Sequence, residues 1–472
     1  MFNTSNQFEK FIKDHVVLQG DKQQELREKK NLNLDRLRDG LNKYNAENNK
    51  KYCIAETRVQ GSMAMNTVIQ NDAHDYDIDV AIVFDKSNIG DDMGPLQARR
   101  LVKKSLDYKM GQFTEDAEVK TNCVRIKYVT GYHVDFAVYR RFKENGSNDY
   151  TYEHAGNEWS KRDPKAITAW FQDEVKNKGT RLRKVVRLSK MFCKSRSFWV
   201  NMPGGFIQSV LCVEKYDTVH SRIDEIFYNT LVSIKDRLEL ENEIYNPTDF
   251  SMSLLTAQNH YDKVNYWKNR LEDKLKSLDV LFENDCTFSK ACRAWNGFFQ
   301  HDFWSGLAEE SVCKSFALAE SYSANSVIRY TDNEQYIEEQ VSAINDIYSV
   351  DVEVKVEANG FRQKPLLEFF RNYKGFKNYI PHGMKIDFYA NTDVPKPYDI
   401  WWKVRNVGEY AENNNQVRGE ILKGHGRHIR EFSQFRGPHF VECYVIKNGE
   451  CMAIKRVPVN IGDIDIKKLS SS

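Results

Sequence analysis

The segment from Asp77 to Phe84 reads Asp-Ile-Asp-Val-Ala-Ile-Val-Phe, so two carboxylates open a strongly apolar run. Its alternation and its β-branched residues predict a strand. Successive side chains of a strand project to opposite faces, so Asp77 and Asp79 lie on the same side. Two adjacent carboxylates repel each other and are costly there without a cation. The chain is therefore expected to build a sheet that carries a divalent-metal site, and Mg²⁺ is the usual ion beside phosphates.

Three further features extend this candidate site. A second strand-like run, His133 to Val138, carries Asp135, which would complete a cluster of three carboxylates. Such a cluster can hold two ions roughly 3.5–4 Å apart, which activate an attacking hydroxyl and stabilise a leaving pyrophosphate. Upstream, Gly61 lets the backbone approach a phosphate closely, and Ser62 adds a hydroxyl donor. Lys190 lies on a basic helix stripe and is a candidate to reach a triphosphate, with a solvated helix face as the equally open alternative.

The pattern of apolar residues divides the chain into helical and strand-rich segments. Residues 8–49 are charge-rich with leucines at helical spacing, and residues 52–139 contain short apolar alternations. Residues 164–303 are mainly helical, and strand texture returns after about residue 346. There, Asn448-Gly449 between two β-like runs is a strong hairpin signal. These segments predict an α+β fold: a sheet with the carboxylates, a mainly helical segment, and a small β-rich C-terminal domain.

Composition narrows the possible classes of protein. The chain has 472 residues, with 69 Lys and Arg against 67 Asp and Glu, and this formal net charge of +2 argues against a coat of basic charge for nucleic acid. No stretch approaches the ~18 consecutive apolar residues of a membrane helix, and the polar N-terminal residues lack the apolar core of a signal peptide. The 9 cysteines then indicate reduced thiols. We expect a cytoplasmic protein with no membrane segment and no nucleic-acid activator.

A motif of known type joins the glycine to the carboxylates. Gln60-Gly61-Ser62, a spacer that includes Thr67, and then Asp75-Tyr76-Asp77-Ile78-Asp79 resemble the DNA polymerase β-like nucleotidyltransferases. More narrowly, they resemble the bacterial CD-NTases, relatives of cyclic GMP-AMP synthase and oligoadenylate synthase. His133-Val134-Asp135 matches the third catalytic carboxylate of that family. The resemblance covers roughly residues 1–310 and implies a polymerase β-like core with a mixed sheet and a bilobal cleft.

The same resemblance implies nucleotide contacts outside the carboxylates. Arg187-Leu188-Ser189-Lys190 matches a helix whose lysine contacts donor phosphates, and the segment from Pro203 to Ser209 matches one usually read as Pro-Ser-Gly-aromatic. From the residues alone, a helix-cap or loop role is favoured for Ser209. Two positions depart from the family pattern: Gly204 stands where Ser is common, and Asn66 stands where Gly is common. The nucleotide-binding residues that the resemblance implies are Gln60, Gly61, Ser62, Lys190 and Ser209.

The C-terminal segment resembles a second kind of domain. Trp401 to Gly408, Arg418-Gly419-Glu420 and Gly437 to Tyr444 look like the adenylyl/guanylyl and SMODS C-terminal (AGS-C) sensor domain, which implies sensing and no chemistry. Neighbouring residues of a strand face opposite ways, so one of the two adjacent tryptophans is expected in the core. The residue types able to stack on or pair with a nucleotide are Trp401, Trp402, Arg405 and Arg418. The residue types able to bind zinc, at a spacing that fits no closed site well, are His425, His428, His439 and Cys443.

These segments and resemblances give a domain plan and a reaction. The plan places N-terminal helices at 1–50, a catalytic sheet at 51–150, a helical lobe at 151–312, a linker at 313–345 and the AGS-C-like domain at 346–472. In the implied reaction, a 2′- or 3′-hydroxyl attacks the α-phosphate of a bound nucleoside triphosphate, with ATP the first expected substrate, and pyrophosphate leaves. Two Mg²⁺ ions, replaceable by Mn²⁺, would be held by Asp77, Asp79 and Asp135.

The product is implied by the family alone. The resemblance implies a cyclic di- or trinucleotide second messenger, a cyclic-nucleotide-responsive effector and bacterial anti-phage (CBASS-type) signalling. Three alternatives stay open: a linear oligonucleotide, nucleotidyl transfer to RNA or protein, and a catalytically silent nucleotide sensor. The near-neutral charge weakens the RNA alternative, and the presence of all three carboxylates weakens the silent sensor.

Overall fold

The computed structural model describes residues 1–70, 76–108, 116–129, 131–144, 146–317, 334–345, 348–357, 362–372, 379–406, 411 and 417–462. The chain forms two compact units, the first made of Met1–Gln19 and Asn33–Ser326 and the second of Gly20–Leu32 and Val327–Ser472. Within the described part of the chain, no helix is long and apolar enough to cross a membrane. The α+β fold class predicted from the sequence is confirmed.

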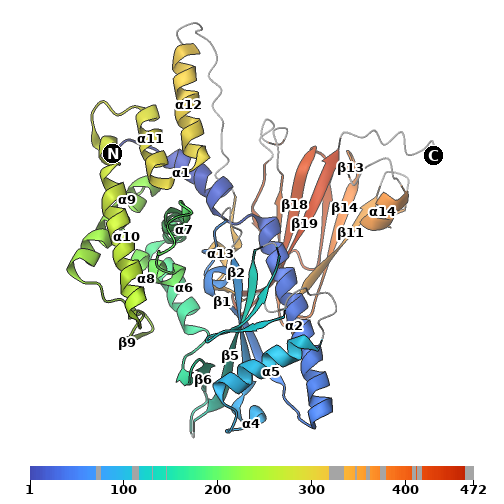
Figure 1. Ribbon diagram of the computed structural model, residues 1–472. Coiled ribbons are helices and arrows are strands. Elements are labelled where there is room, and N and C mark those ends of the chain that lie inside the picture. Colours follow the sequence, from blue (N-terminus) through green and yellow to red (C-terminus); the bar gives the residue numbers. More distant parts are fainter. Residues whose placement is uncertain are drawn as a thin grey trace. The chain divides into compact units, whose positions relative to one another are not determined.

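A mixed sheet organises the first unit (Figure 1). Its strands run in the order β1 (Ile54–Gln60), β2 (Asp77–Asp85), β5 (His133–Lys143), β4 (Val124–Lys127) and β3 (Glu118–Val119), and β6 (Tyr150–Ala155) and β7 (Trp159–Lys161) extend it. Only β2 and β5 of this sheet are parallel; the other pairs are antiparallel. One face carries the fully buried Val80, Ile82, Val134 and Phe136, and α5 (Pro95–Asp107) contacts β3 to β6.

Helices build the rest of the first unit, and several gather beside the sheet in Figure 1. The helices before α5 are α1 (Ser5–Phe11), a π-helical turn at Ile12–Val16, α2 (Gly20–Asn48), α3 (Gly61–Ala64) and α4 (Lys86–Ile89). Of α2, only the part from Asn33 belongs to the first unit. Those after the sheet are α6 (Ala166–Lys178), α7 (Arg181–Lys194), α8 (Gly205–Glu214), α9 (Ile223–Leu240), α10 (Gln258–Lys276), a 3₁₀ turn (Asp279–Phe282), α11 (Phe288–Phe299) and α12 (Asp302–Ala317). A hairpin of β8 (Tyr245–Asn246) and β9 (Asp249–Ser253) connects α9 to α10. The single helical region expected over 8–49 is broken, because Val17 is extended and bridges Ile69.

Helix α7 is buried on both of its faces. Its apolar side carries Leu182 and Val185, which are fully buried as the periodicity predicts. Its basic side is buried as well, since Arg183, Arg187 and Lys190 are 3%, 6% and 8% exposed. A solvated basic face, one of the two interpretations of the sequence, is therefore wrong. Buried cations need partners, and these partners lie at the candidate site.

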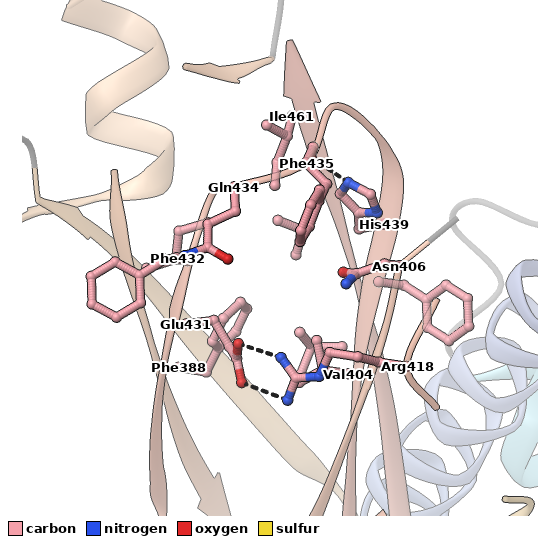
Figure 2. Close-up of a pocket in the computed structure, with 14 residues that line it drawn as sticks. Phe388, Val404, Asn406, Arg418, Glu431, Phe432, Gln434, Phe435, His439 and Ile461 are labelled. Atoms are coloured by element: carbon pink, nitrogen blue, oxygen red, sulfur yellow. Dashed lines mark hydrogen bonds and ion pairs between the residues drawn. The ribbon is translucent and has the colours of Figure 1, made fainter. Parts of the chain in front are cut away.

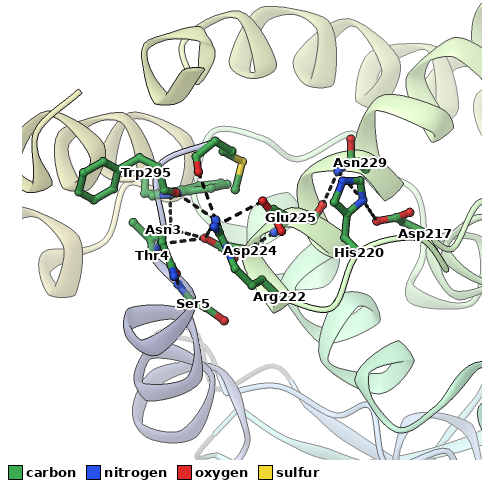
Figure 3. A network of polar contacts seen from close by, with 12 residues as sticks. Asn3, Thr4, Ser5, Asp217, His220, Arg222, Asp224, Glu225, Asn229 and Trp295 are labelled. Carbon is green, nitrogen blue, oxygen red and sulfur yellow. Dashed lines mark hydrogen bonds and ion pairs between the residues drawn. The ribbon is translucent and has the colours of Figure 1, made fainter. Parts of the chain in front are cut away.

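A buried polar network ties the N-terminus to the helical lobe, as Figure 3 shows. The backbone amide and the hydroxyl of Thr4 both donate to Asp224 Oδ2, at 2.8 and 3.0 Å, and the indole of Trp295 donates to the Thr4 hydroxyl at 3.0 Å. Arg222 closes an ion pair with Asp224 at 2.9 Å. Thr4 and Asp224 are both fully buried. A buried carboxylate that keeps all its partners is stabilising, whereas loss of a partner is costly.

The second unit is β-rich, as predicted, and its strands form two sheets. One sheet has the order β10 (Ala343–Ile344), β19 (Glu450–Gly462), β18 (Gly437–Lys447), β15 (Asp399–Arg405) and β16 (Ile421–Leu422), with β13 (Ile380–Pro381) also on β19. The other has the order β12 (Lys364–Pro365), β11 (Val350–Glu357), β14 (Lys385–Thr392) and β17 (His428–Phe432). Two short helices accompany them, α13 (Ile337–Gln340) and α14 (Leu366–Asn372).

Apolar side chains from both sheets form one core, which includes Val352, Phe388 and Trp402. The hairpin predicted at Asn448-Gly449 is confirmed between β18 and β19, and both turn residues have positive φ, 53° and 76°. Of the expected linker, residues 318–333 lie outside the described residues.

Candidate active site

The three carboxylates meet because two parallel strands are in register. In the β2–β5 pairing, Asp77 lies opposite His133 and Asp79 lies opposite Asp135. Side chains of directly opposed residues share one face of a sheet, so Asp135 joins the two carboxylates that strand alternation already pairs. Oxygen atoms of Asp77, Asp79 and Asp135 all lie within 4.8 Å of one another. Asp75, quoted with the motif, lies outside the described residues.

Burial and mutual repulsion perturb this cluster. Desolvation, followed by the charge of Asp135, raises the pKa of Asp77. Desolvation, followed by the charge of Asp77, raises the pKa of Asp79 well above its usual value. The guanidinium of Arg125 opposes both shifts. Three converging oxygen ligands with excess negative charge are the donor set that Mg²⁺ and Mn²⁺ prefer, so these residues fit the divalent ions expected of the site.

The position of Gly61 explains why a glycine precedes Ser62. Gly61 follows β1, whose last residue, Gln60, pairs with Asp79. Its φ is +64°, and a Cβ at this position would lie 1.9 Å from Asp79 Oδ2. No side chain fits there while Asp79 keeps its place. Gly61 therefore lets the turn into α3 press directly against a carboxylate of the cluster.

Helix α7 holds the loop that follows α3 with three cationic side chains. The Arg183 side chain donates to the Met65 carbonyl at 3.3 Å, and Arg187 donates to Asn66 Oδ1 at 2.9 Å. Asn66 has a φ of +53°, a left-handed conformation that Gly adopts freely and Asn tolerates. This explains how Asn can stand where the family pattern has Gly.

Lys190 completes that row and lies at the cleft. Its Nζ donates to the Thr67 carbonyl at 3.0 Å and to the Thr67 hydroxyl at 2.9 Å. Burial lowers the pKa of Lys190 to about 8, and the nearby charge of Asp77 opposes that shift. A Cβ on Gly205 would lie 2.8 Å from Lys190 Cε. The glycine segment at the start of α8 therefore leaves the lysine stem room to lie against the backbone.

A cleft of about 920 Å³ opens beside these groups. Its lining includes Ser62, Thr67, Asp77 and Lys190. It continues along residues 193–200 and 202–205, where Phe198 and Val200 are 64% and 77% exposed. The cleft therefore joins a carboxylate and a lysine to an apolar wall, a combination suited to a charged ligand with a planar apolar part.

Two of the residues that the family resemblance implies for nucleotide binding, Gln60 and Ser209, lie outside the lining of the cleft. The Gln60 amide donates to the Pro164 carbonyl at 2.9 Å. The Ser209 hydroxyl is fully buried and donates to the Gly205 carbonyl at 2.8 Å, within its own helix. Ser209 lies inside α8 and is neither a cap nor a loop residue, so the helix-cap or loop role that the residues alone favoured is wrong, although the hydroxyl does bond the local backbone.

The candidate ligand residues of the second unit are engaged in its own structure. Trp402 is fully buried and its indole donates to the Gly426 carbonyl, so one of the two tryptophans is in the core as expected. Arg405 donates to the Val417 carbonyl at 3.1 Å. Among the described residues, the only group of three or more metal-ligating side chains is the aspartate cluster, so the histidines and Cys443 do not form such a group.

A small cavity of about 110 Å³ lies in this unit (Figure 2). Arg418 forms a two-point ion pair with Glu431 at its wall, at 2.7 and 3.2 Å, and Phe388 and Phe435 are among its apolar neighbours. The ring of His439 bonds the Phe435 carbonyl at 2.5 Å. The cavity therefore combines aromatic rings with an internally neutralised charge.

Sequence reasoning did not single out one basic residue of the candidate site, Arg125, and gave no separate role to another, Arg187, which it quoted only within the helix motif. Arg125 pairs with Asp135, and Arg187 holds Asn66. The alternation Val124-Arg125-Ile126-Lys127 was a signal for a strand with a basic face. No local pattern says which acid such an arginine meets, because that depends on which strands pair.

Comparisons with known proteins identify two domains in the chain. The family profile "Cyclic GMP-AMP synthase DncV-like, nucleotidyltransferase domain" matches residues 55–139, and "Adenylyl/Guanylyl and SMODS C-terminal sensor domain" matches residues 331–462. A curated relative, "Cyclic GMP-AMP synthase" of Escherichia albertii, is 24% identical over an alignment of 423 residues that covers 86% of this chain and 84% of that protein.

Solved structures share the fold. The Vibrio cholerae di-nucleotide cyclase DncV in complex with GTP and 5MTHFGLU2 superposes with a TM-score of 0.53 at 17% identity, over 65% of this chain and 98% of that one. The same enzyme with the linear intermediate 5′ pppA(3′,5′)pG gives a TM-score of 0.51 at 17% identity, over 63% and 96%. The two profiles place a DncV-like nucleotidyltransferase domain at residues 55–139 and an AGS-C sensor domain at residues 331–462, and the chain as a whole is similar to bacterial CD-NTases.

Proposed function

We propose that the chain joins nucleoside triphosphates into a cyclic di- or trinucleotide, with release of pyrophosphate at each bond formed. The observation that carries the proposal is the convergence of Asp77, Asp79 and Asp135, of which Asp77 lines a cleft that also presents Ser62 and Lys190. The E. albertii relative named as a cyclic GMP-AMP synthase supports the product class. A cyclic product would act through a cyclic-nucleotide-responsive effector, in signalling of the CBASS type.

Each carboxylate has a proposed role. Asp77 and Asp79 would hold both divalent ions, and Asp135 would hold the ion beside the attacking hydroxyl and assist removal of its proton. When bound, Mg²⁺ supplies Lewis-acid stabilisation of the charge that develops on the attacking and leaving oxygens. The raised pKa values of Asp77 and Asp79 support this assignment, because a cluster that repels itself when empty gains most from cations.

The phosphates would lie on the other side of the cluster. The Gly61 backbone allows close approach, the Ser62 hydroxyl donates to a phosphate oxygen, and Lys190 exchanges its Thr67 contacts for the triphosphate. The apolar wall around Phe198 would receive a base, since every base has a face that stacks on an aromatic ring. Gln60 and Ser209 would support the strand and helix that position these groups.

Product analysis tests the proposal. The purified chain is incubated with all four labelled ribonucleoside triphosphates and Mg²⁺ or Mn²⁺, treated with phosphatase, and the products are resolved by chromatography and mass. A phosphatase-resistant product that is absent from Asp77→Ala/Asp79→Ala is the expected result, and its mass gives ring size and bases. A phosphatase-sensitive ladder would mean a linear product. Label transferred to added RNA or to protein would mean a different acceptor, and nucleotide binding without turnover would mean a silent sensor.

A further inference from the structure

We propose that Arg125 is a positioning residue that orients the Asp135 carboxylate toward the divalent ions, an inference that rests on the proposed function. Arg125 lies opposite Asp135 in the β4–β5 pairing. Its Nε lies 2.9 Å from Oδ1 and its Nη2 lies 2.6 Å from Oδ2. This is a bidentate fork, the geometry in which an arginine fixes the plane of a carboxylate as well as its charge.

Sheet order puts the Arg125 fork and the Asp79 carboxylate on different sides of Asp135. Strand β5 lies between β2 and β4. Asp79 is therefore the neighbour of Asp135 on one side and Arg125 is its neighbour on the other. A carboxylate has about four acceptor positions on its two oxygens, and the fork uses one on each. The Cys123 thiol also hydrogen-bonds Asp135, which leaves at least one acceptor position of the carboxylate open, so Arg125 need not leave for an ion to bind.

Because the Asp135 side chain is buried, its orientation depends on the two hydrogen bonds from Arg125. The Asp135 side chain is 6% exposed, whereas the Arg125 side chain is 30% exposed. Water can contribute little to holding a carboxylate that is so enclosed, and the groups around it must fix its rotamer. Lysine would supply the same charge but only as a point donor, without the planar fork. Orientation and charge can therefore be separated by substitution.

The same strand provides a matched control. Lys127 lies two residues further along β4 and faces the same side, opposite His133. Its ammonium pairs with Glu118 at 3.0 Å, and its side chain is 45% exposed. Lys127→Met removes one positive charge from the same face of the same strand without touching the cluster. Any effect of Arg125 that is merely long-range charge should appear in this variant as well.

The experiment measures metal binding without turnover. The full-length chain and the variants Arg125→Met, Arg125→Lys and Lys127→Met are titrated with Mn²⁺ in the presence of a saturating non-hydrolysable ATP analogue, and free Mn²⁺ is followed by electron paramagnetic resonance. We expect both Arg125 variants to weaken Mn²⁺ binding about tenfold or more, the range for lost carboxylate-orienting partners. Lys127→Met should bind as the unaltered chain does. Circular dichroism verifies that each variant is folded.

Three outcomes overturn the inference. If the Mn²⁺ affinity of Arg125→Met is within about twofold of that of the unaltered chain, the two hydrogen bonds from Arg125 do not contribute to metal binding. Wild-type binding by Arg125→Lys beside weak binding by Arg125→Met would mean that charge alone matters. If the unaltered chain itself binds no Mn²⁺, the proposed metal site is wrong. This result differs from a failure of the Arg125 inference, in which the unaltered chain binds Mn²⁺ and the variants bind it equally well. If Arg125→Met does not fold, Arg125→Lys alone still decides between fork and charge.

Discussion

The variant Gly61→Ala tests how closely the turn before Ser62 is coupled to the carboxylate cluster. The added Cβ would lie 1.9 Å from Asp79 Oδ2 and 2.9 Å from Asp79 Cγ, distances at which one group must move. The backbone around Gly61 is held by the β1–β2 pairing, so the carboxylate is expected to yield. A left-handed conformation at an alanine costs about 1–2 kcal/mol, and this sets the expected loss in the free energy of unfolding.

Loss of activity should be far larger than loss of stability. A misplacement of about 1 Å at reacting groups can cost about 100-fold in rate, and the separation between the new Cβ and Asp79 Oδ2 must grow by more than that, from 1.9 Å to at least 3.4 Å, to reach ordinary contact. We therefore expect product formation, followed with α-labelled ATP, to fall about 100-fold or more in Gly61→Ala. The matched control is Gly146→Ala, at a φ of +84° with nothing within 4 Å of the new Cβ. It should lose similar stability and keep its rate.

Near-normal turnover in Gly61→Ala would refute this reasoning. If the variant forms product within about threefold of the unaltered chain, the contact between the Cβ and Asp79 is absorbed elsewhere, and the close approach of the turn to the cluster has no catalytic consequence. Equal loss of rate in Gly146→Ala would contradict it as well, because that glycine has a similar φ and no neighbour to displace.

Three other predictions concern stability and metal dependence. Asn66→Val should be about 1–2 kcal/mol less stable than Asn66→Gly, because both variants lose the acceptor of Arg187 but only the β-branched residue is strained at a positive φ. Denaturant unfolding measures both variants, and equal losses would contradict the argument. Asp224→Ala should lower the free energy of unfolding by about 3 kcal/mol, because it leaves the buried amide and hydroxyl of Thr4, and the guanidinium of Arg222, without their acceptor. A loss below about 1 kcal/mol would show that water replaces the carboxylate. Asp77 and Asp79 have raised pKa values in the folded chain, so they bind protons more tightly there than in the unfolded chain, and the metal-free protein loses stability as the pH rises from the unfolded value near 4 through the raised folded values. Mg²⁺ should relieve that loss, so the increase in Tm on adding Mg²⁺ should grow as the pH rises through this range. An increase in Tm that is the same at the lowest and the highest pH of the range would contradict the proposal that these carboxylates bind the ion.

Strand alternation alone predicted much of the candidate site. Asp77 and Asp79 share a face because side chains alternate, and this needs no knowledge of the rest of the fold. The convergence of Asp135 was implied by its strand and by the family motif, but it is the parallel register with Asp79 that brings the carboxylates within 4.8 Å. Register depends on strands distant in sequence, so the pattern within one strand cannot specify it.

Other parts of the fold depend on tertiary contacts that the sequence pattern does not reveal. Helix α5 lies within a region predicted only as strands, although Pro95 at its first position and the buried Leu101, Val102 and Leu106 are typical of an amphipathic helix. The basic face of α7 was compatible with solvent. It is buried because the loop at Asn66 supplies acceptors for its cations, and that loop lies more than a hundred residues away.

The most direct test of the central claim is pyrophosphate release by Asp79→Asn. This change keeps the size of the side chain and its contact with Gly61, but it removes one negative charge from the cluster. Pyrophosphate is measured during incubation with all four ribonucleoside triphosphates and Mg²⁺, with thermal unfolding as the check on the fold. The account predicts steady release by the unaltered chain and a fall of at least about 1,000-fold in the variant, since removed catalytic groups cost on this scale. Release by a folded Asp79→Asn at the unaltered rate would contradict the carboxylate mechanism.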